Sequence, residues 1–292
     1  MPTLLCDFYK TTFEPLKLRT RTQNTKKLYN LTLRQFAEFL NREPIIDDLT
    51  DDTVGAFLNW FKQSGRAAAT TNKNRANLLA LWRYAARKGL TERWPDVHPD
   101  VEPVRVPVAW TKENLERLFS GLKTLTGSVC GIPSADWWTA LHLVCWDAGE
   151  RISALMGAEW QHIDLSNGYL RIPAELRKGR KRDRIYRLAG DTIAAIDKIK
   201  TPERRLIFPW PFHDTYLWTK YGRILKQLNL PNDRKSKFHR MRRSVASHFE
   251  AGGGDAMALL GHSQRRVTEG YLDPRIVGEK HAIDVLFRPV PH

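Results

Sequence analysis

A histidine and a tyrosine nine residues apart, His262 and Tyr271, stand in the stretch LLGHSQRRVTEGYLDP. Tyrosine acts as a nucleophile in covalent catalysis when neighbouring groups activate its hydroxyl. Two interpretations are open. The stretch is either a helix end and a solvated basic turn followed by a tyrosine that only packs its ring, or it carries a tyrosine that attacks a negatively charged substrate.

A second pair of side chains suited to chemistry lies in FHRMRRSVASHFE, where His239 and Arg242 are three residues apart. On a helix this spacing places both side chains on one face, so they could point at one target. Alone, the pair fits an ordinary solvent-exposed basic helix equally well. The apolar residues of this helix are expected to form one stripe: Phe238, Met241, Val245 and Phe249.

Two further cations occupy unusual places. Arg151, in WDAGERISALMGAEW, follows an Ala-Gly turn and precedes an apolar helical run. Lys178 stands before Gly179 at the expected turn of a hairpin. Each has a simpler explanation, a structural salt bridge for the arginine and a solvated loop for the lysine.

The order of these residues resembles that of the tyrosine recombinase, or phage-integrase, family. GERISAL resembles the first arginine box, RKGRKRDR the lysine hairpin, HRMR the His-x-x-Arg box and LLGHS the Leu-Gly-His box, over about residues 107–285. The preceding TTNKNRANLLALWRYAARKG is similar to the core-binding domain of the family. The resemblance implies six catalytic residues: Arg151, Lys178, His239, Arg242, His262 and the nucleophile Tyr271.

The resemblance implies an enzyme that breaks and rejoins DNA through a 3′-phosphotyrosyl intermediate. The arginines would bind the phosphate oxygens, the histidines would hydrogen-bond them or relay the tyrosine proton, and the lysine would protonate the departing 5′ oxygen. These side chains supply the positive charge, so neither a metal ion nor another cofactor is expected. The expected partners are double-stranded DNA with inverted-repeat core sites and three further copies of the chain, in a homotetramer on two sites. Docking of the segment VGEKHAIDVLF on a neighbouring copy or on its own chain stays open.

Three features depart from the family pattern. The acidic residue usual three positions after the first arginine is absent, because Ala154 stands there, and Glu150 or Glu159 is the candidate substitute. The lysine hairpin carries one extra residue, so Lys181 competes with Lys178 for the catalytic role. The three glycines 252–254 replace a longer helix before Leu-Gly-His.

Composition points to a polyanionic partner. Lys and Arg number 47 and Asp and Glu 32, which leaves a formal charge of +15 in 292 residues, and a large basic excess is typical of nucleic-acid-binding proteins. With no membrane-length apolar run and no signal-peptide pattern, the sequence predicts a cytoplasmic, nucleoid-associated protein. A zinc site from Cys130, His142, Cys145 and His162 is a weak alternative without a Cys-x-x-Cys pair. Seven basic residues are candidate DNA contacts: Lys73, Arg75, Arg177, Arg180, Lys181, Arg240 and Arg265.

The expected fold is mainly α-helical, with two domains. Residues 1–100 are expected to form a four-helix-type, SAM-like core-binding bundle, with helices over 25–41, after Thr50, and from about Thr70 to Gly89. Residues 101–110 are expected to form a proline-rich linker. Residues 111–292 are expected to form a mostly helical catalytic domain with a small three-stranded antiparallel sheet, turning at Asn167-Gly168 and at Lys178-Gly179.

Two other functions remain open. A type IB topoisomerase would use similar chemistry on one duplex, and its products would lack strand exchange. A non-catalytic DNA-binding protein could keep the fold without the reaction, although the intact set of six residues argues against it.

Overall fold

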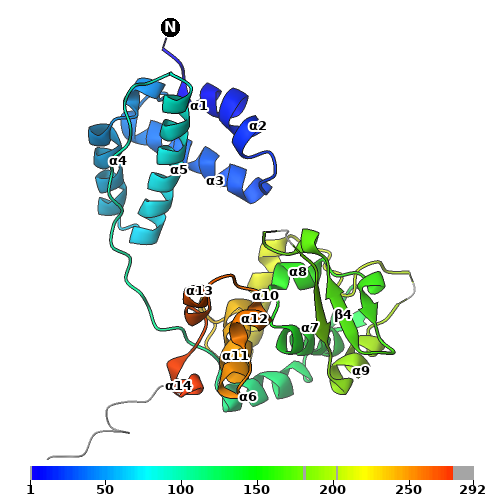
Figure 1. The fold of residues 1–292 in the computed structure, drawn as a ribbon. Helices are drawn as coiled ribbons and strands as arrows, with labels where there is room; N and C mark the ends of the chain where they lie inside the picture. Colours follow the sequence, from blue (N-terminus) through cyan, green and yellow to red (C-terminus); the bar gives the residue numbers. More distant parts are fainter. Residues whose placement is uncertain (1, 180–181, 202, 279–292) are drawn as a thin grey trace, which may run out of the picture. The chain divides into compact units, whose positions relative to one another are not determined.

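The structure is a computed structural model that describes residues 2–179, 182–201 and 203–278. The chain divides into two compact units, Met1–Val104 and Arg105–His292 (Figure 1). Each unit has its own hydrophobic core. Among the described residues, no helix has the length and apolar character needed to cross a membrane.

The N-terminal unit is a four-helix bundle, as the sequence predicts. The side chains of Thr22 and Thr50 accept backbone N–H groups at the starts of the second and third helices. Large aromatic side chains, among them Phe36, Phe57 and Trp82, fill its core. Its helical segments are α1 (Leu5–Phe8), the π-helix η1 (Tyr9–Phe13) and α2 (Glu14–Lys17), which run on as one, then α3 (Gln23–Leu40), α4 (Asp51–Gln63) and α5 (Ala68–Arg87).

The helical stretch from Leu5 to Lys17 is an element that the sequence analysis missed, since it placed the first helix at residue 25. Its buried side chains include Leu5, Phe8, Tyr9 and Phe13, which face the remaining helices. The pattern was hard to find because Pro15 and the π-helical turn shift the apolar residues off the regular helical spacing.

The linker has no helix or strand between residues 92 and 111. Its first part lies along its own unit, because the side chain of Asn72 accepts the N–H of Asp100 at 2.8 Å and donates to its carbonyl at 2.9 Å. Val101 and Val104 are 92 % and 99 % exposed, so the segment leaves the bundle near the unit boundary.

The second unit is mostly helical. Its longest buried helix, α7, ends at Gly149, whose φ of 55° lies in the left-handed region that favours glycine. The helical pattern expected over 136–158 is therefore two helices, and the turn between them places Glu150 and Arg151. The helices of this unit are α6 (Lys112–Leu122), α7 (Ser134–Ala148), α8 (Ile152–Met156), α9 (Gly190–Lys198), α10 (Asp214–Gln227), α11 (Phe238–Ala251), α12 (Ala256–Leu260), α13 (Arg265–Glu269) and α14 (Pro274–Val277).

The predicted three-stranded antiparallel sheet is confirmed, with the order β3-β4-β5 for Ile163–Asp164, Tyr169–Ile172 and Arg184–Arg187. A second, two-stranded sheet pairs β1 (Ser128–Val129) with β2 (Ile132–Pro133). The predicted turn at Lys178-Gly179 is confirmed, since both residues form a turn in which Gly179 has a φ of 92°. Residues 173–183 connect β4 to β5, and the first part of this connection is a 3₁₀ helix, η4 (Ala174–Leu176).

His142 is buried in the aromatic core of the second unit. Its ring lies 4.9 Å from that of Tyr221 and 5.7 Å from that of Phe238, measured between centroids. Its Nδ1 is 2.8 Å from the carbonyl oxygen of Trp138. Burial disfavours the charged imidazole and lowers the pKa of His142 to about 4.

We expect His142 to weaken the fold in acid. The unfolded chain protonates near the ordinary pKa of about 6.5 and the folded chain only near 4, so stability falls as the pH drops between these values. Between pH 7 and 4.5, the variant His142→Phe should lose about 2 kcal/mol less of its free energy of unfolding than the wild type, measured by urea denaturation. His98→Phe, at an exposed position, is the control. An equal loss in wild type and His142→Phe would contradict the assignment.

Candidate active site

Helix α11 carries the His-x-x-Arg pair, and its apolar side anchors it in the unit. Phe238, Met241 and Val245 are buried, as expected. Phe249 is 45 % exposed, so the expected apolar stripe is wrong at its last member. The cause is local: the ring of Phe249 covers Gly254, where an added Cβ would collide with it.

Arg242 is buried and joins three segments of the site. Its guanidinium donates to the carbonyl of Gly149, at the end of α7, and to the carbonyl of Leu260, just before the Leu-Gly-His turn, at 3.0 Å. Its Nη1 also lies 3.5 Å from Oε1 of Glu150. The arginine thus fixes the turn before Arg151 and the turn before His262 on one helix.

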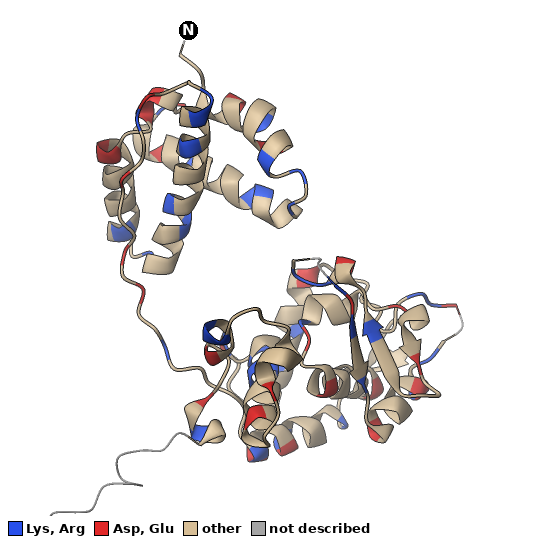
Figure 2. Cartoon of the chain, viewed as in Figure 1, with Lys and Arg blue, Asp and Glu red and all other residues tan. Residues whose placement is uncertain are grey.

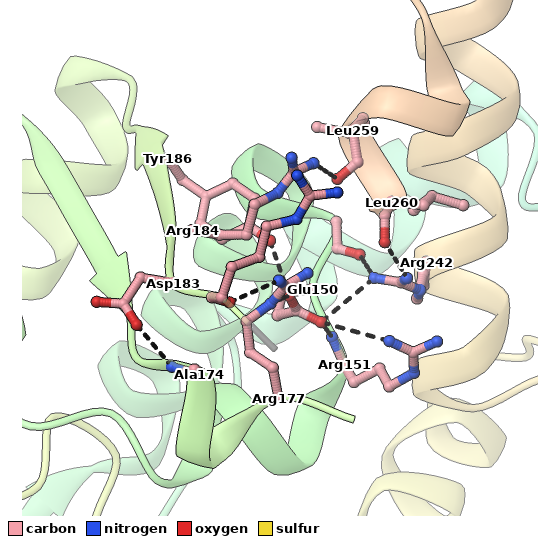
Figure 3. A network of polar contacts seen from close by, with 12 residues as sticks. Glu150, Arg151, Ala174, Arg177, Asp183, Arg184, Tyr186, Arg242, Leu259 and Leu260 are labelled. Atoms are coloured by element: carbon pink, nitrogen blue, oxygen red, sulfur yellow. Dashed lines mark hydrogen bonds and ion pairs between the residues drawn. The ribbon is translucent and has the colours of Figure 1, made fainter. Parts of the chain in front are cut away.

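Glu150 is the carboxylate at the centre of this network (Figure 3). Its fully buried side chain accepts from Nε of Arg177 at 2.7 Å, from the hydroxyl of Tyr186 at 2.8 Å and from the backbone N–H of Arg151 at 2.8 Å. Its Oε1 lies 3.9 Å from Nη1 of Arg151. Burial alone would raise the pKa of Glu150, but these donors and the charge of Arg242 outweigh it and lower the pKa.

The two candidate substitutes for the missing acid are thereby distinguished. Glu150 contacts both site arginines, Arg151 and Arg242, whereas Glu159 pairs with the exposed Arg205 at 3.2 Å. Ala154, at the position where the family pattern has its acid, is buried in α8.

Tyr271 lies in the turn between α13 and α14. Its ring centroid is 5.5 Å from Cζ of Arg242, 5.4 Å from the ring of His239 and 5.0 Å from the ring of His262. Its N–H donates to the carbonyl of Thr268 at 2.7 Å. The ring packs against a small cluster of buried residues: Ala246, Ala256 and Leu260.

His239 is exposed to solvent on one side and crowded by protein and by cations on the other. Partial desolvation and the surrounding positive charges lower its pKa to about 4. The cations responsible are, in order of effect, Arg243, Arg242, Arg151 and Lys178. The imidazole is therefore neutral near pH 7 in the free protein.

His262 has the same property for a similar reason. Desolvation, Arg242 and Arg151 lower its pKa to about 4. Its Nδ1 lies 3.1 Å from the hydroxyl of Thr268, while its Nε2 is buried without a hydrogen-bond partner among the described residues.

Lys178 lies exposed in the connection between β4 and β5. Its charge has the smallest effect of those that lower the pKa of His239. Its competitor Lys181, and Arg180 beside it, lie outside the described residues.

The other candidate DNA contacts differ in whether their side chains already have hydrogen-bond partners inside the protein. Lys73 is exposed on α5. Four arginines have partners inside the protein: Arg75 donates to the carbonyl of Val97, Arg177 to Glu150, Arg240 to the carbonyl of Val108, and Arg265 to Glu250. Figure 2 shows Lys and Arg along α5 in one unit and around α11 and α13 in the other.

Three features of the site were not predicted. Arg184 donates to the carbonyls of Ala258 and Leu259 and so ties the sheet to the Leu-Gly-His segment. Tyr186 supports Glu150 from the same strand. No signal in the sequence marks either residue, because neither stands at a spacing that distinguishes it from the basic residues around it. A groove of about 780 Å³ also opens beside His239, and it is lined by Thr215, Trp218, Arg234, Lys235, Lys237, His239 and Arg243.

Among the residues that the structure describes, no three His, Cys, Asp or Glu side chains gather in a way that could hold a metal ion. The two histidines of the zinc alternative have other partners. The Nδ1 of His142 lies at hydrogen-bond distance from the carbonyl oxygen of Trp138, and that of His162 accepts the N–H of Glu159 at 3.0 Å.

The chain matches two family models. Residues 110–276 match the phage integrase family, and residues 13–89 match the phage integrase N-terminal SAM-like domain. The chain belongs to the phage integrase family. Membership confirms the predicted class of enzyme, a tyrosine-type site-specific recombinase.

Solved structures show that this integrase shares its fold with DNA-bound relatives. The Tn1549 transposon integrase with circular intermediate DNA is 18 % identical, with a TM-score of 0.71 over 92 % of this chain and 95 % of that one. A lambda integrase dimer on a COC′ core site is 19 % identical, with a TM-score of 0.70 over 95 % and 96 %. XerH recombinase on palindromic difH DNA is 18 % identical, with a TM-score of 0.68 over 87 % and 77 %. No protein of curated function shows a significant sequence match.

We expect Glu150→Gln to destabilise the integrase strongly. The change leaves the buried Arg242 without its counter-charge, and removing one partner of a buried ion pair costs about 3–5 kcal/mol. The matched variant Glu159→Gln breaks a pair with a largely exposed arginine and should cost about 1 kcal/mol or less. Urea denaturation of both variants at pH 7 measures the difference. Equal costs would show that Glu150 is not the supporting carboxylate.

Proposed function

We propose that the protein cleaves and rejoins DNA through a 3′-phosphotyrosyl intermediate, with Tyr271 as the nucleophile. The observation that carries the proposal is the position of the Tyr271 ring, beside His239, His262 and the guanidinium of Arg242. The phenolic oxygen attacks phosphorus, the P–O5′ bond breaks, and the 5′ oxygen leaves with a proton. A free 5′ hydroxyl reverses the reaction on the same or on another strand.

The arginines supply the charge that the reaction needs. Arg242 and Arg151 share one carboxylate, Glu150, so the pair keeps a net positive charge that favours the oxygens of a phosphodiester. The same charge favours the pentacoordinate phosphorus, whose oxygens are more negative than those of the substrate. A metal ion is not needed for this role.

The histidines are suited to handle protons. A neutral imidazole accepts a proton, and the lowered pKa values keep His239 and His262 neutral near pH 7 in the free protein. One of them accepts the phenolic proton of Tyr271, and the other hydrogen-bonds an oxygen of the phosphate. Lys178 protonates the departing 5′ oxygen.

Duplex DNA is the proposed substrate, bound by both units. The net charge of +15 and the exposed cations of α5 and of the groove beside His239 support this proposal. Residues 1–100 would act as the core-binding domain, 101–110 as the linker and 111–292 as the catalytic domain. Inverted-repeat core sites and a homotetramer on two sites complete the proposal. XerH on palindromic DNA supports the inverted repeat, and the lambda integrase dimer on its core site supports more than one copy of the chain per site. The enzyme would then act at the nucleoid, in the cytoplasm.

We expect Tyr271→Phe to bind DNA as the wild type does and to form no covalent adduct, because only the attacking oxygen is lost. Electrophoresis of protein–DNA adducts on a nicked suicide substrate measures this, with excess EDTA present to test the independence from metal. An adduct formed by Tyr271→Phe would exclude Tyr271 as the nucleophile. Strand-exchange products from two sites would separate a recombinase from a topoisomerase.

We expect Lys178→Ala to cleave an ordinary site slowly and a site with a 5′-bridging sulfur at nearly the wild-type rate. An alkoxide needs a proton to leave, whereas a thiolate leaves without one. Single-turnover cleavage of both substrates measures the effect, and Lys181→Ala is the matched variant. Rescue of Lys181→Ala by sulfur, with Lys178→Ala still slow, would reverse the assignment of the two lysines.

A further inference from the structure

A buried set of hydrogen bonds connects the nucleophile's turn to helix α11 and to the end of the linker. We define the tyrosine tether as Ser247, Asp273 and the backbone N–H of Ala109. All three residues are buried. None of them belongs to the six residues that carry the chemistry.

Ser247 holds the turn from the side of α11. Its hydroxyl accepts the N–H of Asp273 at 2.9 Å and donates to the carbonyl of Tyr271 at 3.3 Å. One hydroxyl therefore fixes the backbone on both sides of Leu272, directly after the nucleophile. Helix α11 also carries His239 and Arg242, so the tether sets the position of the tyrosine relative to both.

Asp273 holds the turn from the side of the linker. Its Oδ2 accepts the N–H of Ala109 at 2.9 Å, and its carboxylate is bound by two nitrogens of Arg275, at 2.9 Å and 2.6 Å. Burial raises the pKa of Asp273, but these donors outweigh it and lower the pKa, so the carboxylate is charged near pH 7. Its side chain also accepts the N–H of Arg275 at the start of α14.

The linker end is itself fixed to α11 on the far side of Ala109. The N–H of Trp110 donates to the hydroxyl of Ser244 at 2.7 Å, and the carbonyl of Trp110 lies 3.0 Å from Nε2 of His248. The guanidinium of Arg240 lies 4.5 Å from the Trp110 ring. Ala109 is therefore a rigid donor, and Asp273 is bound to a fixed point.

We propose that Ser247 and Asp273 are positioning residues for the nucleophile, and that the seated linker end is part of the support of Tyr271. The proposal rests on the proposed function, in which Tyr271 attacks the phosphate. A nucleophile displaced by about 1 Å loses up to roughly a hundredfold in rate, because attack needs an aligned approach. Neither residue touches DNA phosphate in this scheme, so loss of the tether slows cleavage and leaves binding unchanged.

The test measures cleavage and binding separately in the full chain. Ser247→Ala and Asp273→Ala should lower the single-turnover rate of adduct formation at saturating DNA by roughly ten- to a hundredfold, with the Kd for DNA changed by less than about threefold. Asp273→Asn keeps an oxygen that accepts the N–H of Ala109 and should recover much of the rate. Asp164→Ala is the control, because it also removes a carboxylate that accepts a backbone N–H in a turn, that of Asn167 at 3.0 Å, and it leaves the turn of Tyr271 intact, so it should change the rate by less than about threefold.

Three outcomes would overturn the proposal: wild-type rates in Ser247→Ala and Asp273→Ala, a loss of rate that matches a loss of DNA affinity, or equal slowing by Asp164→Ala. Ser247→Ala removes a single oxygen, so the test holds even if Asp273→Ala fails to fold. Failure of the proposed function has a different signature, since Tyr271→Phe would then still form the adduct.

Discussion

The site depends on one buried negative charge among several positive ones. Glu150 contacts three arginine side chains, Arg151, Arg177 and Arg242, and compensates one charge of the three. Arginines cannot be discharged at neutral pH, so burying them without a counter-ion would cost several kcal/mol. A full complement of carboxylates would stabilise the free protein further and would leave nothing to attract a phosphate. The single carboxylate keeps the cations in place and leaves the site positive.

The sequence identified more readily the residues that we propose to react than the residues that support them. The spacing of His239, Arg242, His262 and Tyr271 follows from family boxes, and the structure brings these four together. Regular helices were also predictable, because a cap such as Thr50 and the spacing of apolar residues are local signals. The roles of the other arginines were not predictable. An arginine bound to a buried carboxylate and an arginine that faces solvent look alike in the sequence. Arg177, expected at the DNA, donates instead to Glu150.

The relocated acid shows how a site can be kept while its pattern changes. The residue before Arg151 lies in the turn after Gly149, whose left-handed conformation ends α7 and turns the next side chain inward. A carboxylate there reaches Arg242 and the sheet at once, through Arg177 and Tyr186. Ala154, three residues after Arg151, lies in α8, and its methyl side chain cannot act as a counter-ion for an arginine. Sequence spacing alone could not choose between Glu150 and Glu159, because the choice depends on where a helix breaks.

Burial and the same cations together set the protonation of two histidines in the site. Desolvation, with Arg242 and Arg151, lowers the pKa of both His239 and His262, so both imidazoles are neutral near pH 7 in the free protein. A phosphodiester brings a negative charge to these residues, and an opposite charge nearby raises the pKa of a histidine. In the proposed reaction, binding of DNA would therefore make each imidazole a better proton acceptor when Tyr271 loses its proton. The arginines proposed to bind the phosphate and the histidines proposed to accept the proton would then be coupled through charge, and the phosphate would supply the negative charge that Glu150 alone does not.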